Sequence, residues 1–133
     1  MEHVDDPERA FSLRMTTWQW RHLDGAVDSA VSIAAESDDP HQVVQTGSGI
    51  REAGWDQIAH WTPGVAGSGN WPTDDEEVAI KLSRRQWGLA AQCAAHWAAV
   101  ASGVGHEQEA AVLRSVHALV VEGLRAESAR PAR

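Results

Sequence analysis

The stretch "LRMTTWQW" at residues 13–20 recurs in altered form as "IKLSRRQW" at residues 80–87. In and beside both stretches, apolar residues alternate with polar ones, the period of two that is typical of a half-buried strand. We therefore expect one strand at each place. The alternating apolar residues are Phe11, Leu13 and Met15 in the first strand and Val78, Ile80 and Leu82 in the second.

A helix is expected to begin directly after each strand. Thr16 stands three residues before Gln19, and Ser83 stands three residues before Gln86. This is the spacing of a capping box, in which two side chains satisfy unpaired backbone N–H groups at a helix start. Beyond each cap, apolar residues recur every three or four positions and so share one helix face. These stripes are Trp20, Leu23, Val27, Ala30, Val31 and Ala34, and then Trp87, Ala90, Ala94, Trp97, Ala98 and Ala101.

A further helix is predicted in each half. The first is expected to open at Asp39 and Pro40, as N-cap and first helical residue, and its interior glycines at 46–50 weaken it. Its counterpart begins after the "SGVG" linker and has a more strongly apolar stripe. Corresponding positions lie 67 residues apart in the strands and first helices and 69 apart in the second helices.

The sequence therefore predicts a mainly α fold made of a duplicated β-α-α unit. Four main helices would pack around a small antiparallel β-ribbon with pseudo-twofold symmetry; the alternative is chance similarity within an Ala-rich helical chain. Because a two-stranded ribbon is marginal alone, the helices must cover it or a second chain must extend it, giving a homodimer through strand pairing. The expected parts are a flexible N-terminus (1–10), one domain (11–126, comprising repeat one 11–59, linker 60–77 and repeat two 78–126) and a flexible tail (127–133).

Composition narrows the class of protein. The chain of 133 residues has room for one domain with a true core. No apolar run approaches the roughly 20 residues of a membrane span, and the acidic start "MEHVDDPERA" is unlike a secretory signal, so we expect a cytoplasmic protein without membrane association. The single cysteine, Cys93, excludes an intrachain disulfide and any Cys-based zinc cluster.

Charge is unevenly distributed along the chain. The net charge is −8, with 15 acidic against 4 basic residues in 1–77 and 4 against 7 in 78–133. An acidic surface repels a phosphate backbone and attracts basic partners, so direct nucleic-acid binding is disfavoured and a protein partner is expected. The plain alternative is that acidic faces keep a small protein soluble.

The seven tryptophans fall into three groups. Trp20, Trp87 and Trp97 lie on helix stripes and are predicted to be core residues. Trp18, at the helix entrance, could be core or surface. Trp55, Trp61 and Trp71 lie in or beside the Gly/Pro-rich linker and are candidate partner-binding anchors, unless they only hold that loop on the core.

Two charged groups are also candidates for binding. The acidic run Asp74, Asp75, Glu76 and Glu77 lacks the spacing of a calcium loop and is either a partner-binding surface or simply solvated. Positive charge in the first turn of a helix opposes the helix dipole. Arg84 and Arg85 lie in such a first turn, so a function could explain their presence. Together with Lys81 they are candidates for a patch that binds an anion or an acidic partner; the alternative is scattered surface charge.

No catalytic residue, metal site or cofactor is predicted. The histidines include neither an i, i+4 pair nor an HExxH motif, and the chain lacks a GxSxG motif and a phosphate-binding loop. Cys93 lies beside an apolar stripe without basic neighbours, which favours a packed thiol over a reactive one.

Two functions remain open. The leading hypothesis is a small acidic, non-enzymatic protein-binding module. It would act as a regulator or inhibitor, by charge mimicry towards a nucleic-acid-handling protein, in the manner of a phage or plasmid accessory protein. The alternative is a small enzyme or ligand-binding domain whose site lies at the repeat junction and uses His60, Trp61 and Trp71.

Overall fold

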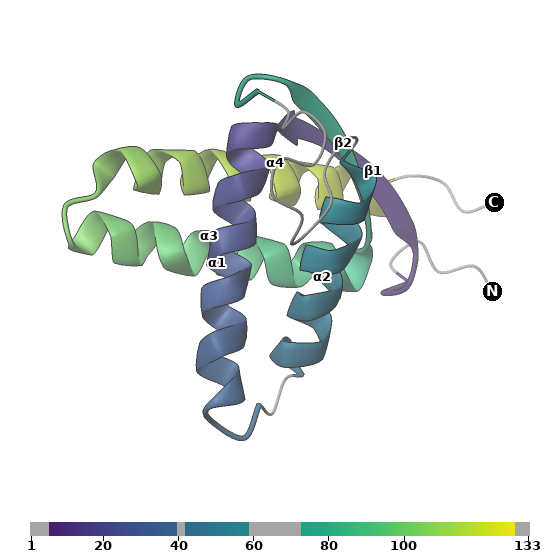
Figure 1. Cartoon of the computed structure of the whole chain (residues 1–133). Helices are drawn as coiled ribbons and strands as arrows, with labels where there is room; N and C mark the ends of the chain where they lie inside the picture. The colour runs from purple at the N-terminus through teal and green to yellow at the C-terminus, as the bar shows by residue number, and fades with distance from the viewer. Residues whose placement is uncertain (1–5, 40–41, 59–72, 130–133) are drawn as a thin grey trace.

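Four helices and one two-stranded sheet make up the described part of the chain. The computed structural model describes residues 6–39, 42–58 and 73–129. The elements are β1 (Ala10–Thr16), α1 (Thr17–Ala35), α2 (Val43–Gln57), β2 (Glu77–Ser83), α3 (Arg84–Gly103) and α4 (Glu107–Ser128). The mainly helical prediction with a small antiparallel sheet is confirmed. Figure 1 shows the α1–α2 pair crossing the α3–α4 pair, with the β-ribbon at one end of both pairs.

The two strands pair antiparallel over their whole length. Ala10 lies opposite Ser83, Leu13 opposite Ile80, and the register contains no bulge. The predicted alternation is present, because Phe11, Met15, Ile80 and Leu82 are buried while the residues between them are largely exposed. The ribbon thus presents one apolar face to the helices, which solves the weakness of an isolated two-stranded sheet.

Both predicted capping boxes are formed. The Gln19 N–H donates to Thr16 Oγ1 at 3.1 Å, and the Thr16 N–H donates to Gln19 Oε1 at 2.9 Å. In the other half, the Gln86 N–H donates to Ser83 Oγ at 3.1 Å, and the Ser83 N–H donates to Gln86 Oε1 at 2.9 Å. Each strand therefore passes into a helix without an intervening loop.

The start of α2 differs from the prediction. The helix begins at Val43, preceded by Gln42 in the left-handed conformation (φ 56°, ψ 39°). The Asp39 carboxylate still caps it from upstream, accepting from the Val43 N–H at 2.6 Å and the Val44 N–H at 3.2 Å. Asp39 caps the helix as predicted, but the N-cap position itself is held by Gln42, so the predicted helix start is wrong. Pro40, the predicted first helical residue, lies outside the described residues.

The core contains the two corresponding tryptophans. Trp20 and Trp87 are both 0% exposed, which confirms their predicted burial, and Trp97 is partly buried against the same core. The Trp87 Nε1–H donates to the Phe11 carbonyl at 3.0 Å, whereas Trp20 Nε1 finds no acceptor in the described ranges. Trp20 instead packs edge-on against Trp55, with ring centroids 5.9 Å apart. The two buried indoles are therefore held by different contacts.

Helix α2 approaches the Trp20 ring at a glycine. A Cβ added at Gly54 would collide with Cη2 and Cζ2 of the Trp20 indole. The ring is fully buried, so it has little freedom to move away. Gly54 is therefore required for the contact between α1 and α2, although glycine weakens a helix interior.

Replacing Gly54 tests this packing. We expect Gly54→Ala to lower the free energy of unfolding by about 1–3 kcal/mol through overpacking. Gly25→Ala is the matched control, since a Cβ there meets nothing within 4 Å, and it should raise stability by about 0.5–1 kcal/mol. Urea unfolding of both variants measures the difference, and equal stability would contradict the proposed close approach.

Candidate functional site

The acidic run lies in the turn that enters β2, beside the start of α1. Asp74, Asp75, Glu76 and Glu77 are all exposed. The carbonyls of Asp74 and Glu76 accept the backbone N–H groups of Trp18 and Thr17, both at 2.9 Å, and so fix the run to the first turn of α1.

Some of these carboxylates are already engaged within the chain. Arg21 pairs with Asp74 at 2.9 Å and Arg14 with Glu77 at 3.1 Å, with all four side chains about half exposed or more. Exposed pairs of this kind contribute little to stability. The run is therefore a fixed and partly neutralised acidic edge.

The tryptophans assigned to the linker are not brought together on a described surface. Trp55 is partly buried and packs against the core. Trp61 and Trp71 lie outside the described residues, as does His60, on which the ligand-site alternative relied. Their predicted roles in binding stay predictions.

The basic candidates lie around the start of α3. Lys81 and Arg85 are exposed and Arg84 is partly buried. Arg85 Nε donates to Glu8 Oε2 at 2.7 Å, so this guanidinium has an acidic partner within the chain. An acceptor from another molecule would compete with Glu8.

The outer edge of β2 is occupied at Lys81. The Lys81 N–H donates to Gln57 Oε1 at 2.6 Å, and its carbonyl accepts from Gln57 Nε2 at 2.8 Å. A strand that paired with β2 from a second chain would have to displace this side chain. The homodimer through strand pairing stays a prediction, and forming it would break both hydrogen bonds between Gln57 and the Lys81 backbone.

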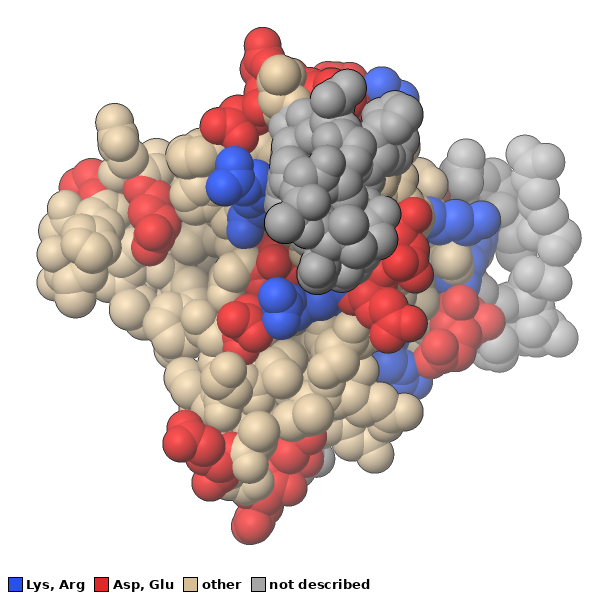
Figure 2. All heavy atoms as spheres, in the orientation of Figure 1, with Lys and Arg blue, Asp and Glu red and all other residues tan. Residues whose placement is uncertain are grey.

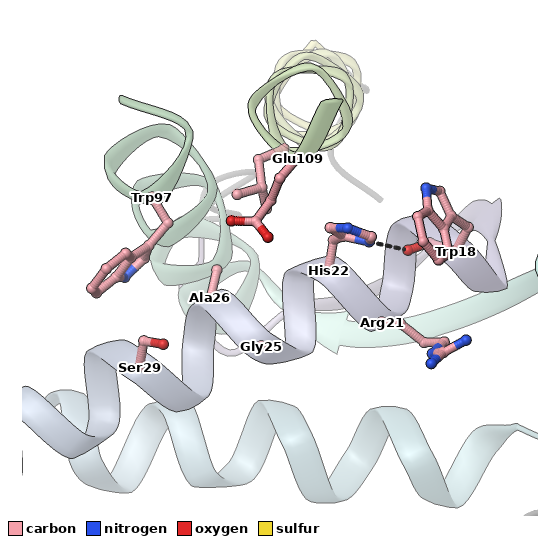
Figure 3. Close-up of a pocket in the computed structure, with 9 residues that line it drawn as sticks. Trp18, Arg21, His22, Gly25, Ala26, Ser29, Trp97 and Glu109 are labelled. Atoms are coloured by element: carbon pink, nitrogen blue, oxygen red, sulfur yellow. Dashed lines mark hydrogen bonds between the residues drawn. The ribbon is translucent and has the colours of Figure 1, made fainter. Parts of the chain in front are cut away.

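A cleft that the sequence did not predict lies where α1 crosses the α3–α4 pair (Figure 3). Its volume is about 430 Å³. A neighbouring hollow of about 770 Å³ shares Trp18, His22 and Glu109 with it and extends along the α3–α4 turn. Figure 3 shows the Glu109 carboxylate directed into the space between Trp97 and His22, above Ala26 of α1.

Trp18 lines one end of this cleft and contacts two neighbouring side chains of α1. Its side chain is 41% exposed, and the His22 ring packs edge-on against it with centroids 4.4 Å apart. His22 Nδ1 lies 3.0 Å from the Trp18 carbonyl, which can only accept, so Nδ1 carries a proton. The Arg21 guanidinium carbon lies 5.9 Å from the Trp18 ring centroid.

Glu109 supplies an unpaired carboxylate to the cleft. It lies in the first turn of α4, is exposed, and has no hydrogen-bond or ion-pair partner among the described residues. Its neighbour Glu107 accepts from the Ser102 hydroxyl at 3.1 Å and lies 4.0 Å from Arg114. Glu109 is thus the carboxylate of this turn that is available to a ligand.

Sequence reasoning missed the cleft because its walls are distant in the chain. Trp18 and Glu109 come from the starts of the first and last helices, and Trp97 comes from α3. No local motif joins them. The available signal was Trp18 itself, a large aromatic residue at a helix entrance whose position the apolar stripe did not explain.

Acidic side chains dominate several edges of the surface. Figure 2 shows them around the tip of the α1–α2 pair and beside the turn before β2. Basic side chains are interspersed with them near the strands, consistent with the pairs formed by Arg14 and Arg21.

Metal ligands and the single thiol are two kinds of chemical group that the described residues allow us to assess. No group of three or more His, Cys, Asp or Glu side chains in the described ranges could hold a metal ion. Cys93 is 4% exposed, and burial raises the pKa of its thiol from 9.0 to about 11. The packed-thiol interpretation of Cys93 agrees with this burial.

Alkylation tests the environment of Cys93. A pKa of about 11 in place of 9.0 lowers the thiolate fraction at pH 8 about a hundredfold. We expect iodoacetamide to modify the native thiol at least that much more slowly than the thiol of the urea-unfolded chain, as followed by mass spectrometry. Comparable rates in the two states would contradict a buried Cys93.

Comparison with known proteins gives no match: no family model, no curated protein and no solved structure is significantly similar to the chain. Within the described residues, none of the helices combines the length and apolar character that a membrane crossing requires.

Proposed function

We propose that the chain is a small acidic protein-binding module without enzymatic activity, which regulates or inhibits a basic partner protein in the cytoplasm. One observation carries this proposal. Arg21 pairs with Asp74 and lies over the Trp18 ring, so the acidic run and the half-exposed indole form one continuous surface. We call this surface the acidic-aromatic corner; it consists of Trp18, Arg21 and residues 74–77.

The corner combines two features that protein interfaces use differently. Complementary charge steers a partner and sets specificity. Exposed tryptophan is enriched among the residues that carry binding energy. The backbone bonds from Trp18 and Thr17 fix both features on one rigid frame, which lowers the entropy lost on binding. In an inhibitor that mimics nucleic-acid charge, the carboxylates of residues 74–77 would be the groups that face the partner.

Neutralising the acidic run tests the proposal. The variant Asp74→Asn, Asp75→Asn, Glu76→Gln and Glu77→Gln should lose a partner that the parent chain captures from lysate of the source cells, and added salt should weaken the parent complex. The matched control removes the same four charges elsewhere in the first half. Its changes are Glu36→Gln, Asp38→Asn, Glu52→Gln and Asp56→Asn, all at exposed positions.

Quantitative mass spectrometry of the captured proteins distinguishes the outcomes. A protein lost with the first variant and kept with the control supports the corner as the contact surface. Equal loss with both variants would reduce the effect to general charge, and capture that ignores both would contradict the proposal.

The alternative function is a ligand-binding domain or small enzyme with its site between the halves. The cleft favours it, since α1 of the first half and α3 and α4 of the second half line it and its volume lies in the range of small-molecule sites. Thermal denaturation with a metabolite library separates the two. A ligand that raises the melting temperature of the parent chain but not of Glu109→Gln would favour the alternative.

We also propose that the fold arose by internal duplication and has pseudo-twofold symmetry. Its support is a set of paired backbone bonds: the Thr17 N–H donates to the Glu76 carbonyl at 2.9 Å, and the Arg84 N–H donates to the Arg9 carbonyl at 2.8 Å. Adding 67 to one partner and subtracting 67 from the other converts the first bond into the second. The same holds for Trp18 to Asp74 and Arg85 to Pro7, and for the strand register.

An experimental structure tests the duplication. Residues 6–35 should superpose on residues 73–102 position for position, because each capped helix start has the same spacing to its strand. A superposition that needed a shift in register within this span would contradict common descent of the halves.

A further inference from the structure

We propose that the cleft between Trp18, Trp97 and Glu109 is the receptor for an arginine side chain of the partner protein. The inference rests on the proposed function and makes it more specific, because it names the chemical group that enters the cleft. The acidic run would then steer the partner, and the cleft would hold one of its guanidinium groups.

The aromatic walls suit a flat cation. A guanidinium placed over an indole is attracted by the ring quadrupole, and tryptophan is the best aromatic partner for it. The chain already contains such a contact, with the Arg21 guanidinium carbon 5.9 Å from the Trp18 ring centroid. Trp97 supplies a second indole on the far side of the cleft, and Figure 3 shows the Glu109 carboxylate between the two aromatic walls.

The charges around the cleft favour a cation over an anion. The Asp, Glu, Lys and Arg residues that line the two hollows are Arg21, Glu107 and Glu109. Arg21 is paired with Asp74, and Glu107 accepts from the Ser102 hydroxyl. Glu109 is left without a partner in the described ranges, and an incoming guanidinium could donate two parallel N–H bonds to it.

Arginine fits this site better than lysine. Its planar group can stack on an indole while its N–H fork meets a carboxylate, whereas an ammonium is a compact and strongly hydrated point charge. The site is also larger than one side chain needs. Hollows of about 430 and 770 Å³ share Trp18, His22 and Glu109, so the chain on either side of the arginine could continue along the α3–α4 turn.

The corresponding place in the other half has different chemistry. Positions 67 residues after Trp18, His22 and Gly25 are Arg85, Leu89 and Gln92. These three residues also line a hollow, of about 420 Å³, against the start of α2. The frame thus offers two related hollows, and the one with Arg85 at its edge would repel the cation that the cleft accepts.

A short peptide tests the inference directly. The probe is acetyl-Ala-Arg-Ala-amide, and the readout is the set of indole Nε1–H resonances in ¹⁵N NMR spectra of the full chain, assigned by single Trp→Phe variants. We expect saturable shifts of the Trp18 and Trp97 resonances. Glu109→Gln should weaken binding about tenfold, the effect of losing a hydrogen bond to a charged group.

Matched controls separate the site from general charge. Glu52→Gln makes the same change at an exposed position of α2 that does not line the cleft, and it should bind the peptide as the parent does. A citrulline peptide has nearly the same shape without the charge and should bind much more weakly. Trp18→Ala should also weaken binding, with circular dichroism to establish that the variant is folded.

Several results would overturn the inference. They are equal weakening by Glu109→Gln and Glu52→Gln, equal binding of the citrulline peptide, and Trp18 and Trp97 resonances that do not move when the arginine peptide is added. If tetramethylammonium binds as tightly as the arginine peptide, the ligand of the cleft would be a small cation and not an arginine side chain. If the parent chain does not bind the peptide but captures a partner through the acidic run, the arginine receptor alone is overturned. If the parent chain binds the peptide but the acidic run makes no difference to partner capture, the acidic run alone is overturned as the contact surface.

Discussion

The antiparallel pairing of β1 with β2 is the contact on which the rest of the structure depends. It joins segments 67 residues apart, with Leu13 opposite Ile80 at its centre. Because each strand passes straight into a capped helix, the register of the ribbon also determines where α1 and α3 begin. A slip of one residue would turn the buried face of one strand outward relative to the other and would displace the helix start that follows the slipped strand.

The crossing of the two helix pairs follows from that start. The first turn of α1 is bonded to the turn before β2, and the first turn of α3 is bonded to the segment before β1. Each helix pair is thereby tied to the strand of the other half. The hollows form where the helices of one half meet those of the other, so their position belongs to the frame while their chemistry depends on a few side chains.

Those side chains differ most at the two helix entrances. Trp18 lies at the start of α1, where it contacts Arg21, which in turn pairs with Asp74. Arg85 lies at the start of α3 and pairs with Glu8. Because the two helix entrances offer unlike surfaces, a partner that fits one of them would not fit the other in the same way. The proposed arginine receptor uses this difference.

The sequence by itself determined the strands, both capping boxes and the burial of Trp20 and Trp87, because these depend on periodicity and on spacings of three or four residues. Only the tertiary structure decided the first residue of α2 and the cleft. The left-handed Gln42 that sets the helix start has no strong local signal, and the walls of the cleft meet only after α4 folds back across α1. Contacts between side chains so far apart in the chain depend on how the helices cross, and no pattern within one segment contains that information.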